Sequence, residues 1–164
     1  MNYKVEDVTD IEEKIALDEK YKEKLCVIPD NLFRKTDEEE YIFAFSLPTI
    51  KKLLKSGDID MHILGNSEEI NLIDQRGLEY FVPIFLISSL FYFQNPDAFN
   101  IALSMIARYL EQLSPSKKNS KVNFTIYTRD DKTKNTKRIH YEGPIDGIEE
   151  LKNVVKETMK SFEE

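Results

Sequence analysis

The stretch that decides the fold is EYFVPIFLISSLFYFQNPDAF, residues 79–99. Between residues 80 and 93, only Pro83, Ser88 and Ser89 interrupt a run of aromatic and aliphatic side chains. This run is shorter than the roughly 20 apolar residues that a membrane-spanning helix requires. We therefore expect a buried core element and no association with a membrane.

A helix-start signal follows this run. Asn95 suits a helix N-cap, and Pro96 suits the first helical position. The apolar residues then recur at spacings of three and four, at Phe99, Ala102, Leu103, Ile106, Tyr109, Leu110 and Leu113. This pattern predicts an amphipathic helix over 96–113. We interpret residues 82–93 as a second helix, apolar nearly all round, so that the two form a central helical hairpin.

The residues before this run predict a small α/β part. The tetrad TDIE, residues 9–12, matches a helix capping box and predicts a charged helix that continues to about residue 24. Short apolar runs and turn residues predict strands over 25–28 and 41–45, a helix over 47–56, and a hairpin of 59–64 with 70–73.

The last third of the chain predicts a ββα unit. Over 122–127, Val122, Phe124 and Ile126 alternate with Asn123, Thr125 and Tyr127. This alternation is typical of a half-buried strand. A second strand is expected over 137–142, and apolar residues then recur at helical spacing from 148 to 162.

Together these elements predict an α+β fold in three successive parts. They are an N-terminal α/β part over 1–78, the central helical hairpin over 79–113 and the C-terminal ββα unit over 120–164. Because 164 residues suit a single domain, we expect the three parts to form one compact domain.

The sequence has none of the patterns that are typical of a catalytic, cofactor-binding or metal site. Cys26 is the only cysteine, and His62 and His140 have no metal-ligand spacing. The five glycines suit turns and helix ends rather than a phosphate-binding loop. We therefore expect no catalytic residue, no cofactor and no metal. Residues 1–14 lack the apolar core of a signal peptide, which leads us to expect a cytoplasmic protein.

Charge is distributed unevenly along the chain, whose formal net charge is −7. Residues 117–138 contain eight basic side chains against Asp130 and Asp131. A basic hairpin with aromatic neighbours is typical of a nucleic-acid surface. The residues that would contact nucleic acid are Lys117, Lys118, Lys121, Lys134, Lys137 and Arg138. We keep this function as an alternative and do not favour it, because the acidic remainder of the chain repels polyanions.

The aromatic run suggests a protein interface. A small domain has limited interior in which to enclose a helix that is apolar on every side, so part of it is expected to meet another chain. The candidate interface residues are Phe85, Phe91, Tyr92 and Phe93. Full burial within the monomer is an equally weighted reading. A third reading is a pocket in which Arg76 and Arg108 anchor an anionic ligand.

From these observations we expect a non-enzymatic interaction or regulatory module. It would act as an accessory protein in an oligomer or a larger complex, with a copy of itself or another protein as its partner. The alternatives are nucleic-acid binding through 117–138 and a small-molecule binding protein or enzyme. The heavy use of Lys, Ile, Asn and Glu resembles the composition of proteins from AT-rich bacterial or phage genomes.

Overall fold

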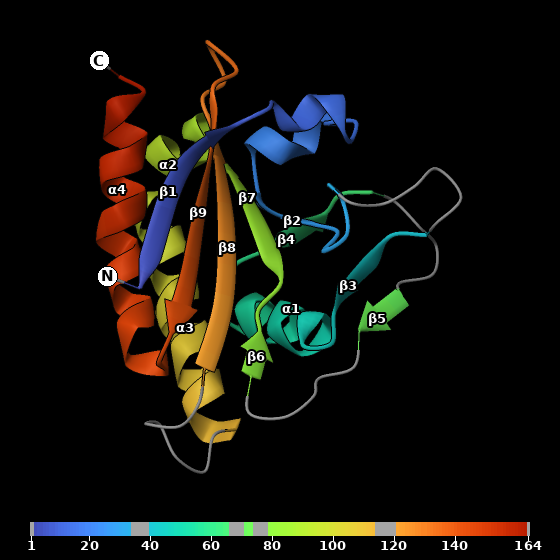
Figure 1. Ribbon diagram of the computed structural model, residues 1–164, viewed down its shortest axis with the longest axis vertical. Coiled ribbons are helices and arrows are strands. Elements are labelled where there is room, and N and C mark those ends of the chain that lie inside the picture. Colours follow the sequence, from blue (N-terminus) through green and yellow to red (C-terminus); the bar gives the residue numbers. More distant parts are fainter. Residues whose placement is uncertain (1, 34–39, 66–70, 74–78, 114–120, 164) are drawn as a thin grey trace.

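The computed structural model describes residues 2–33, 40–65, 71–73, 79–113 and 121–163, and it shows a mixed α+β fold (Figure 1). The strands are β1 (Tyr3–Val8), β2 (Leu25–Ile28), β3 (Ile42–Ala44), β4 (Met61–Ile63), β5 (Asn71–Ile73), β6 (Glu79–Phe81), β7 (Ile84–Ser88), β8 (Lys121–Arg129) and β9 (Thr136–Gly143). The helices are α1 (Leu47–Ser56), α2 (Ser89–Gln94), α3 (Pro96–Leu113) and α4 (Leu151–Ser161), with the 3-10 turns η1 (Ile11–Glu13), η2 (Glu19–Lys22) and η3 (Ile145–Glu150).

One mixed sheet organises the molecule, with strand order β1-β9-β8-β7-β2-β4. The β1–β9, β9–β8 and β7–β2 pairs are antiparallel, whereas β8–β7 and β2–β4 are parallel. The short strand β6 pairs with the beginning of β8, and β7 pairs with its end, so the two follow one path along β8. β3 and β5 form a separate parallel pair. Strands from all three predicted parts of the chain therefore contribute to one sheet.

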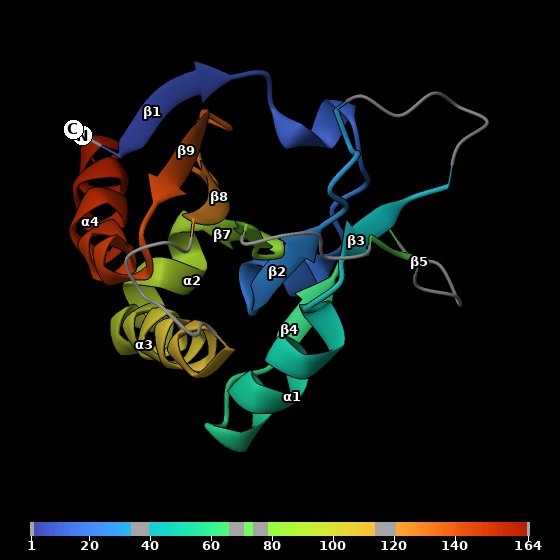
Figure 2. The same cartoon turned by 60° about the horizontal axis from the view of Figure 1, so that its bottom comes forward.

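Two hydrophobic layers enclose the central strands of the sheet. The four α-helices lie on one face, and the segment that follows β1 lies across the other face (Figure 2). Along β2, Leu25 and Val27 point into the helix-side core while Cys26 and Ile28 point into the opposite core. The second layer extends only to Tyr127 on β8 and the end of β1. Beyond it, β9 and most of β1 turn a polar face outward.

The interpretation of residues 82–93 as one helix is wrong. The structure divides this stretch into strand β7 and the short helix α2, which begins where the Ser88 hydroxyl accepts a hydrogen bond from the Phe91 N–H. Phe85 and Ile87 enter the helix-side core, and Leu86 enters the opposite one. A strand covered on both faces reads as a continuous apolar run, and periodicity alone does not separate it from a buried helix.

The charged helix expected after residue 9 is also wrong. Residues 3–8 form β1, and the following segment contains only the turns η1 and η2. Its apolar side chains, Ile11, Ile15 and Tyr21, are buried against the sheet face opposite the helices. Tertiary burial of these widely spaced residues overrides the local helix signal.

The hairpin expected between residues 59–64 and 70–73 does not form. β4 instead lies parallel to β2, and β5 lies parallel to β3, so each pairs with a strand that is distant in sequence. The structure confirms the helices expected over 47–56 and 96–113 and the two C-terminal strands followed by a helix. None of the described helices is both long and apolar enough to cross a membrane.

Candidate interaction surface

The four aromatic residues expected at an interface have two different locations. Phe85, Phe91 and Tyr92 are buried within the chain itself, at 1%, 6% and 6% exposure. Phe93 is 42% exposed on α2, as is Leu90 one helical turn earlier. Of the expected set, only Phe93 therefore offers a surface to another molecule.

The basic residues of the expected nucleic-acid surface point in different directions. The Lys137 Nζ lies on the helix side, 3.3 Å from Ser161 Oγ, whereas Arg138 lies on the opposite sheet face and donates to Glu6 at 3.0 Å. Lys134 Nζ lies 3.8 Å from a carboxylate oxygen of Glu12.

The structure also describes Lys121 of the expected nucleic-acid surface and Arg108 of the expected anion pocket. Lys121 forms an ion pair with Glu142, and Arg108 is exposed on α3. Lys117, Lys118 and Arg76 lie outside the described residues. The described cations are thus divided between two faces, and several are paired with carboxylates.

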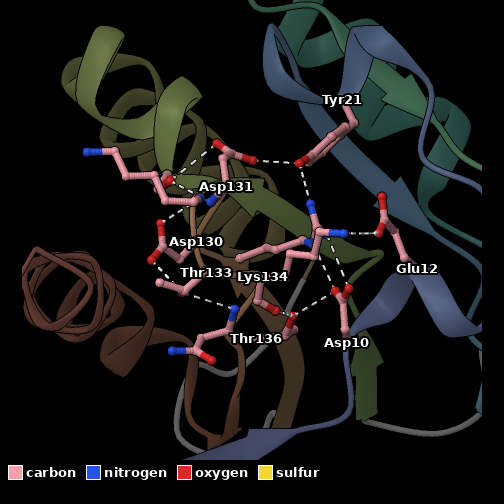
Figure 3. Close-up of polar contacts among 12 residues, drawn as sticks. Asp10, Glu12, Tyr21, Asp130, Asp131, Thr133, Lys134 and Thr136 are labelled. Carbon is pink, nitrogen blue, oxygen red and sulfur yellow. Dashed lines mark hydrogen bonds and ion pairs between the residues drawn. The ribbon is translucent and has the colours of Figure 1, made fainter.

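A buried arginine joins the N-terminal segment to the end of β8. The Arg129 side chain is 3% exposed, and its Nε and one terminal nitrogen donate to the two carboxylate oxygens of Asp10 at 2.8 and 3.2 Å. The same terminal nitrogen also lies 3.1 Å from a carboxylate oxygen of Glu12. The other terminal nitrogen donates to the Tyr21 hydroxyl at 2.5 Å. These residues, which we name the Arg129 clasp, converge from three segments of the chain (Figure 3).

Asp131 extends the Arg129 clasp to helix α2. One of its carboxylate oxygens accepts a hydrogen bond from the Tyr21 hydroxyl at 2.5 Å, and the other accepts from the Leu90 N–H at 2.9 Å and the Ser89 hydroxyl at 3.2 Å. A carboxylate at a helix N-terminus satisfies N–H groups that have no partner within the helix. The clasp therefore fixes the segment after β1, the β8–β9 turn and α2 relative to one another.

The electrostatics of the Arg129 clasp favour the ionised forms of Asp10 and Arg129. Burial works against ionisation of Asp10, but the hydrogen bonds and the positive charge of Arg129 outweigh it and lower the pKa of Asp10. Burial, followed by the neighbouring Asp131 carboxylate, raises the pKa of Tyr21. Because the guanidinium already bonds two carboxylates and a phenol, we interpret the clasp as a structural anchor rather than a ligand site.

The uncovered face of β8 and β9 carries a small polar group around His140. The Nδ1 of His140 lies 2.8 Å from the Thr125 hydroxyl, and its Nε2 lies 3.7 Å from Glu142. Burial and the charge of Arg138 lower the pKa of His140, which favours the neutral imidazole at pH 7. A neutral imidazole can accept a proton, but its partners here are its neighbours on the sheet. No three His, Cys, Asp or Glu side chains in the described part of the chain gather as a metal ion would require.

The backbone of β1 is exposed at the edge of the sheet. β1 pairs with β9 from Tyr3 opposite Tyr141 to Val8 opposite Thr136, and the Glu142 N–H donates to the Asn2 carbonyl. Residues of an antiparallel pair alternate between facing the partner strand and facing away from it. By this alternation, Asn2, Lys4, Glu6 and Val8 face β9, and Tyr3, Val5 and Asp7 face outward. Among the described strands, none follows β1 on that side.

The side chains of β1 also alternate between two environments. Glu6 accepts from Arg138 and lies 3.6 Å from Lys4 Nζ, which places both on the uncovered polar face. Val5 is opposite the buried Ile139 and lies on the helix side, yet it is 41% exposed because it is on the edge strand. We name the outward backbone groups of Tyr3, Val5 and Asp7, with these side chains, the β1 edge.

The expected site residues did not include the β1 edge. The only local signal for it is the alternation in YKVEDV, residues 3–8, where Tyr3 and Val5 alternate with Lys4 and Glu6. Such alternation is typical of a half-buried strand. We predicted no element over residues 3–8, since the capping box at residues 9–12 predicts a helix only after them.

The chain was compared with protein-family models, with curated proteins and with solved structures, and none of them matches it.

Proposed function

We propose that this chain is a non-enzymatic protein-interaction module that binds its partner by strand addition at the β1 edge. The observation that carries the proposal is the outward row of backbone N–H and C=O groups on Tyr3, Val5 and Asp7. An unpaired strand edge is a template for another extended segment, whose main chain supplies complementary hydrogen bonds.

The Arg129 clasp supports this proposal because it holds the edge strand in place. Asp10 lies two residues beyond the end of β1 and is bound by Arg129 through two hydrogen bonds. A strand that is already ordered loses less conformational entropy when a partner adds to it. The clasp thus presents the β1 edge in a binding-ready conformation.

The proposal can be tested with a variant that removes one outward donor. Val5→Pro deletes the N–H that points to the free edge and leaves the residues that bond β9 unchanged, a position where a sheet tolerates proline. Val5→Ala retains that N–H and is the matched control. Tagged wild-type and variant chains are expressed in the cells that make the protein, cross-linked and purified, and the attached proteins are quantified by mass spectrometry.

We expect a partner that is recovered with the wild type and with Val5→Ala but lost with Val5→Pro. Phe93→Ser tests the exposed aromatic residue of α2 in the same assay. Recovery that is insensitive to Val5→Pro would contradict binding at the β1 edge. Recovery that is lost with Phe93→Ser but not with Val5→Pro would assign the contact to α2.

A further inference from the structure

We infer that the strand added at the β1 edge is β1 of a second copy, antiparallel, with Val5 on the two-fold axis. This inference rests on the proposed function and specifies its partner. It would join two sheets into one continuous sheet whose centre is the β1–β1 pair.

Backbone geometry permits this register. Antiparallel pairing about Val5 places Val5 opposite the partner's Val5, and Tyr3 opposite the partner's Asp7. All of these residues face the free edge. Each such pair exchanges two hydrogen bonds. If one strand were shifted by one residue, outward-facing residues would lie opposite residues that face β9. The backbone hydrogen bonds between the two copies would then be lost.

The charges of β1 select this register among those with compatible hydrogen bonds. With Val5 on the axis, Lys4 lies opposite the partner's Glu6, and the two-fold repeats this attractive pair. The two nearest alternatives place either Lys4 opposite the partner's Lys4 or Glu6 opposite the partner's Glu6. Opposite charges across a strand pair stabilise it and like charges destabilise it. The sequence KVE, residues 4–6, is therefore complementary to itself in one register.

The side chains match on both faces of the sheet. Val5 is 41% exposed on the helix side, where it would meet the partner's Val5. On the opposite face, Glu6 already accepts a hydrogen bond from Arg138. The partner's Lys4 would add a second cation to this carboxylate. Pairing would thus cover an exposed aliphatic side chain and extend an existing ion pair across the axis.

A cysteine pair measures the register directly. Residues directly opposite in a hydrogen-bonded pair have Cα atoms about 5.5 Å apart, which is within the range that a disulfide bridges. Val5→Cys should form an intermolecular disulfide under mild oxidation. Asp7→Cys is the matched control, because its copies would lie about 14 Å apart along the strands. The native Cys26 is buried, with its pKa raised by burial to about 12, and should remain unreactive.

A charge-reversal pair tests the selectivity. Lys4→Glu and Glu6→Lys should each weaken self-association by about tenfold or more, because two attractive pairs become repulsive. Mixed together, the two variants restore opposite charges at both positions and should recover a heterodimer. Native mass spectrometry distinguishes this heterodimer from either homodimer.

The inference is overturned if Val5→Cys cross-links no faster than Asp7→Cys, or if Lys4→Glu associates like the wild type. Its failure can be separated from that of the proposed function by expressing the chain with two different tags. A different protein that is lost with Val5→Pro, together with no co-purification of the two tagged copies, supports strand addition and rejects self-pairing.

Discussion

Arg129 binds both carboxylate oxygens of Asp10, at 2.8 and 3.2 Å, across a separation of 119 residues in the sequence. This contact ties the beginning of the chain to the last hairpin of the sheet. Because the Arg129 side chain is 3% exposed, its positive charge is stabilised by its protein partners rather than by water. The stability of the fold should therefore respond strongly to its removal.

Arg129→Ala should lower the free energy of unfolding by about 2–4 kcal/mol, since it leaves the Asp10 carboxylate without its cation and removes one of the two hydrogen bonds of the Tyr21 hydroxyl. Arg138→Ala is the matched control, because its ion pair with Glu6 is half-exposed and should contribute about 0–1 kcal/mol. Urea denaturation followed by circular dichroism measures both. Equal losses would show that the Arg129 clasp is not a stability determinant.

Stability should fall at acid pH partly through Asp10. Its pKa is lowered in the folded chain, so its contribution is complete above the unfolded pKa of about 3.9 and is lost as the pH falls through the folded value. Urea midpoints for the wild type should therefore decline below about pH 4. Asp10→Asn should be less stable at pH 7 and show a shallower acid decline. An unchanged pH profile in this variant would contradict the prediction.

Gly147 should not tolerate a side chain. A Cβ at this position would lie well under 3 Å from the Tyr141 hydroxyl, which donates to the Pro144 carbonyl. Gly147→Ala should therefore cost about 1–3 kcal/mol through overpacking. In Gly57→Ala the new atom meets the flexible end of Met105 at 3.0 Å, and we expect a smaller loss. Thermal unfolding of both variants compares them, and a larger loss for Gly57→Ala would be inconsistent with this geometry.

Oligonucleotides should not bind tightly at physiological salt. Lys137 and Arg138 lie on opposite sheet faces, and Arg138 is paired with Glu6. A fluorescence-anisotropy titration with single- and double-stranded oligonucleotides tests this expectation. Micromolar binding that weakens steeply with salt, and that is lost in the triple variant Lys134→Gln, Lys137→Gln and Arg138→Gln, would favour the nucleic-acid alternative.

The elements that sequence reasoning predicted well are those specified by local patterns. The helix α3 has a regular apolar stripe and a proline at its start, and the strands β8 and β9 follow each other as a hairpin. β7 was predicted as part of a helix and β1 was not predicted at all, because the structure of both depends on distant strands. β7 is enclosed by β8 and β2, which lie on either side of it in the sequence. No local window contains that information.

The site was less predictable than the fold for the same reason. Arg129 appeared in the sequence only as one of eight basic residues between 117 and 138, and Asp10 only as part of a capping box. Their pairing requires β8 to end beside the segment that follows β1. The complementarity of Lys4 and Glu6 is readable in the sequence, but it becomes relevant only once β1 is known to be an edge strand.

The pairing of β1 with β9 also has a consequence for synthesis of the protein. Tyr3 on β1 pairs opposite Tyr141 on β9, and Tyr141 leaves the ribosome much later than Tyr3 does. At about 5–20 residues per second, the first strand waits on the order of ten seconds for its neighbour. During this interval β1 has no neighbouring strand to pair with, so it cannot yet form an ordered sheet edge. In the proposed assembly, a partner strand could therefore add to β1 only in chains whose β9 has already emerged.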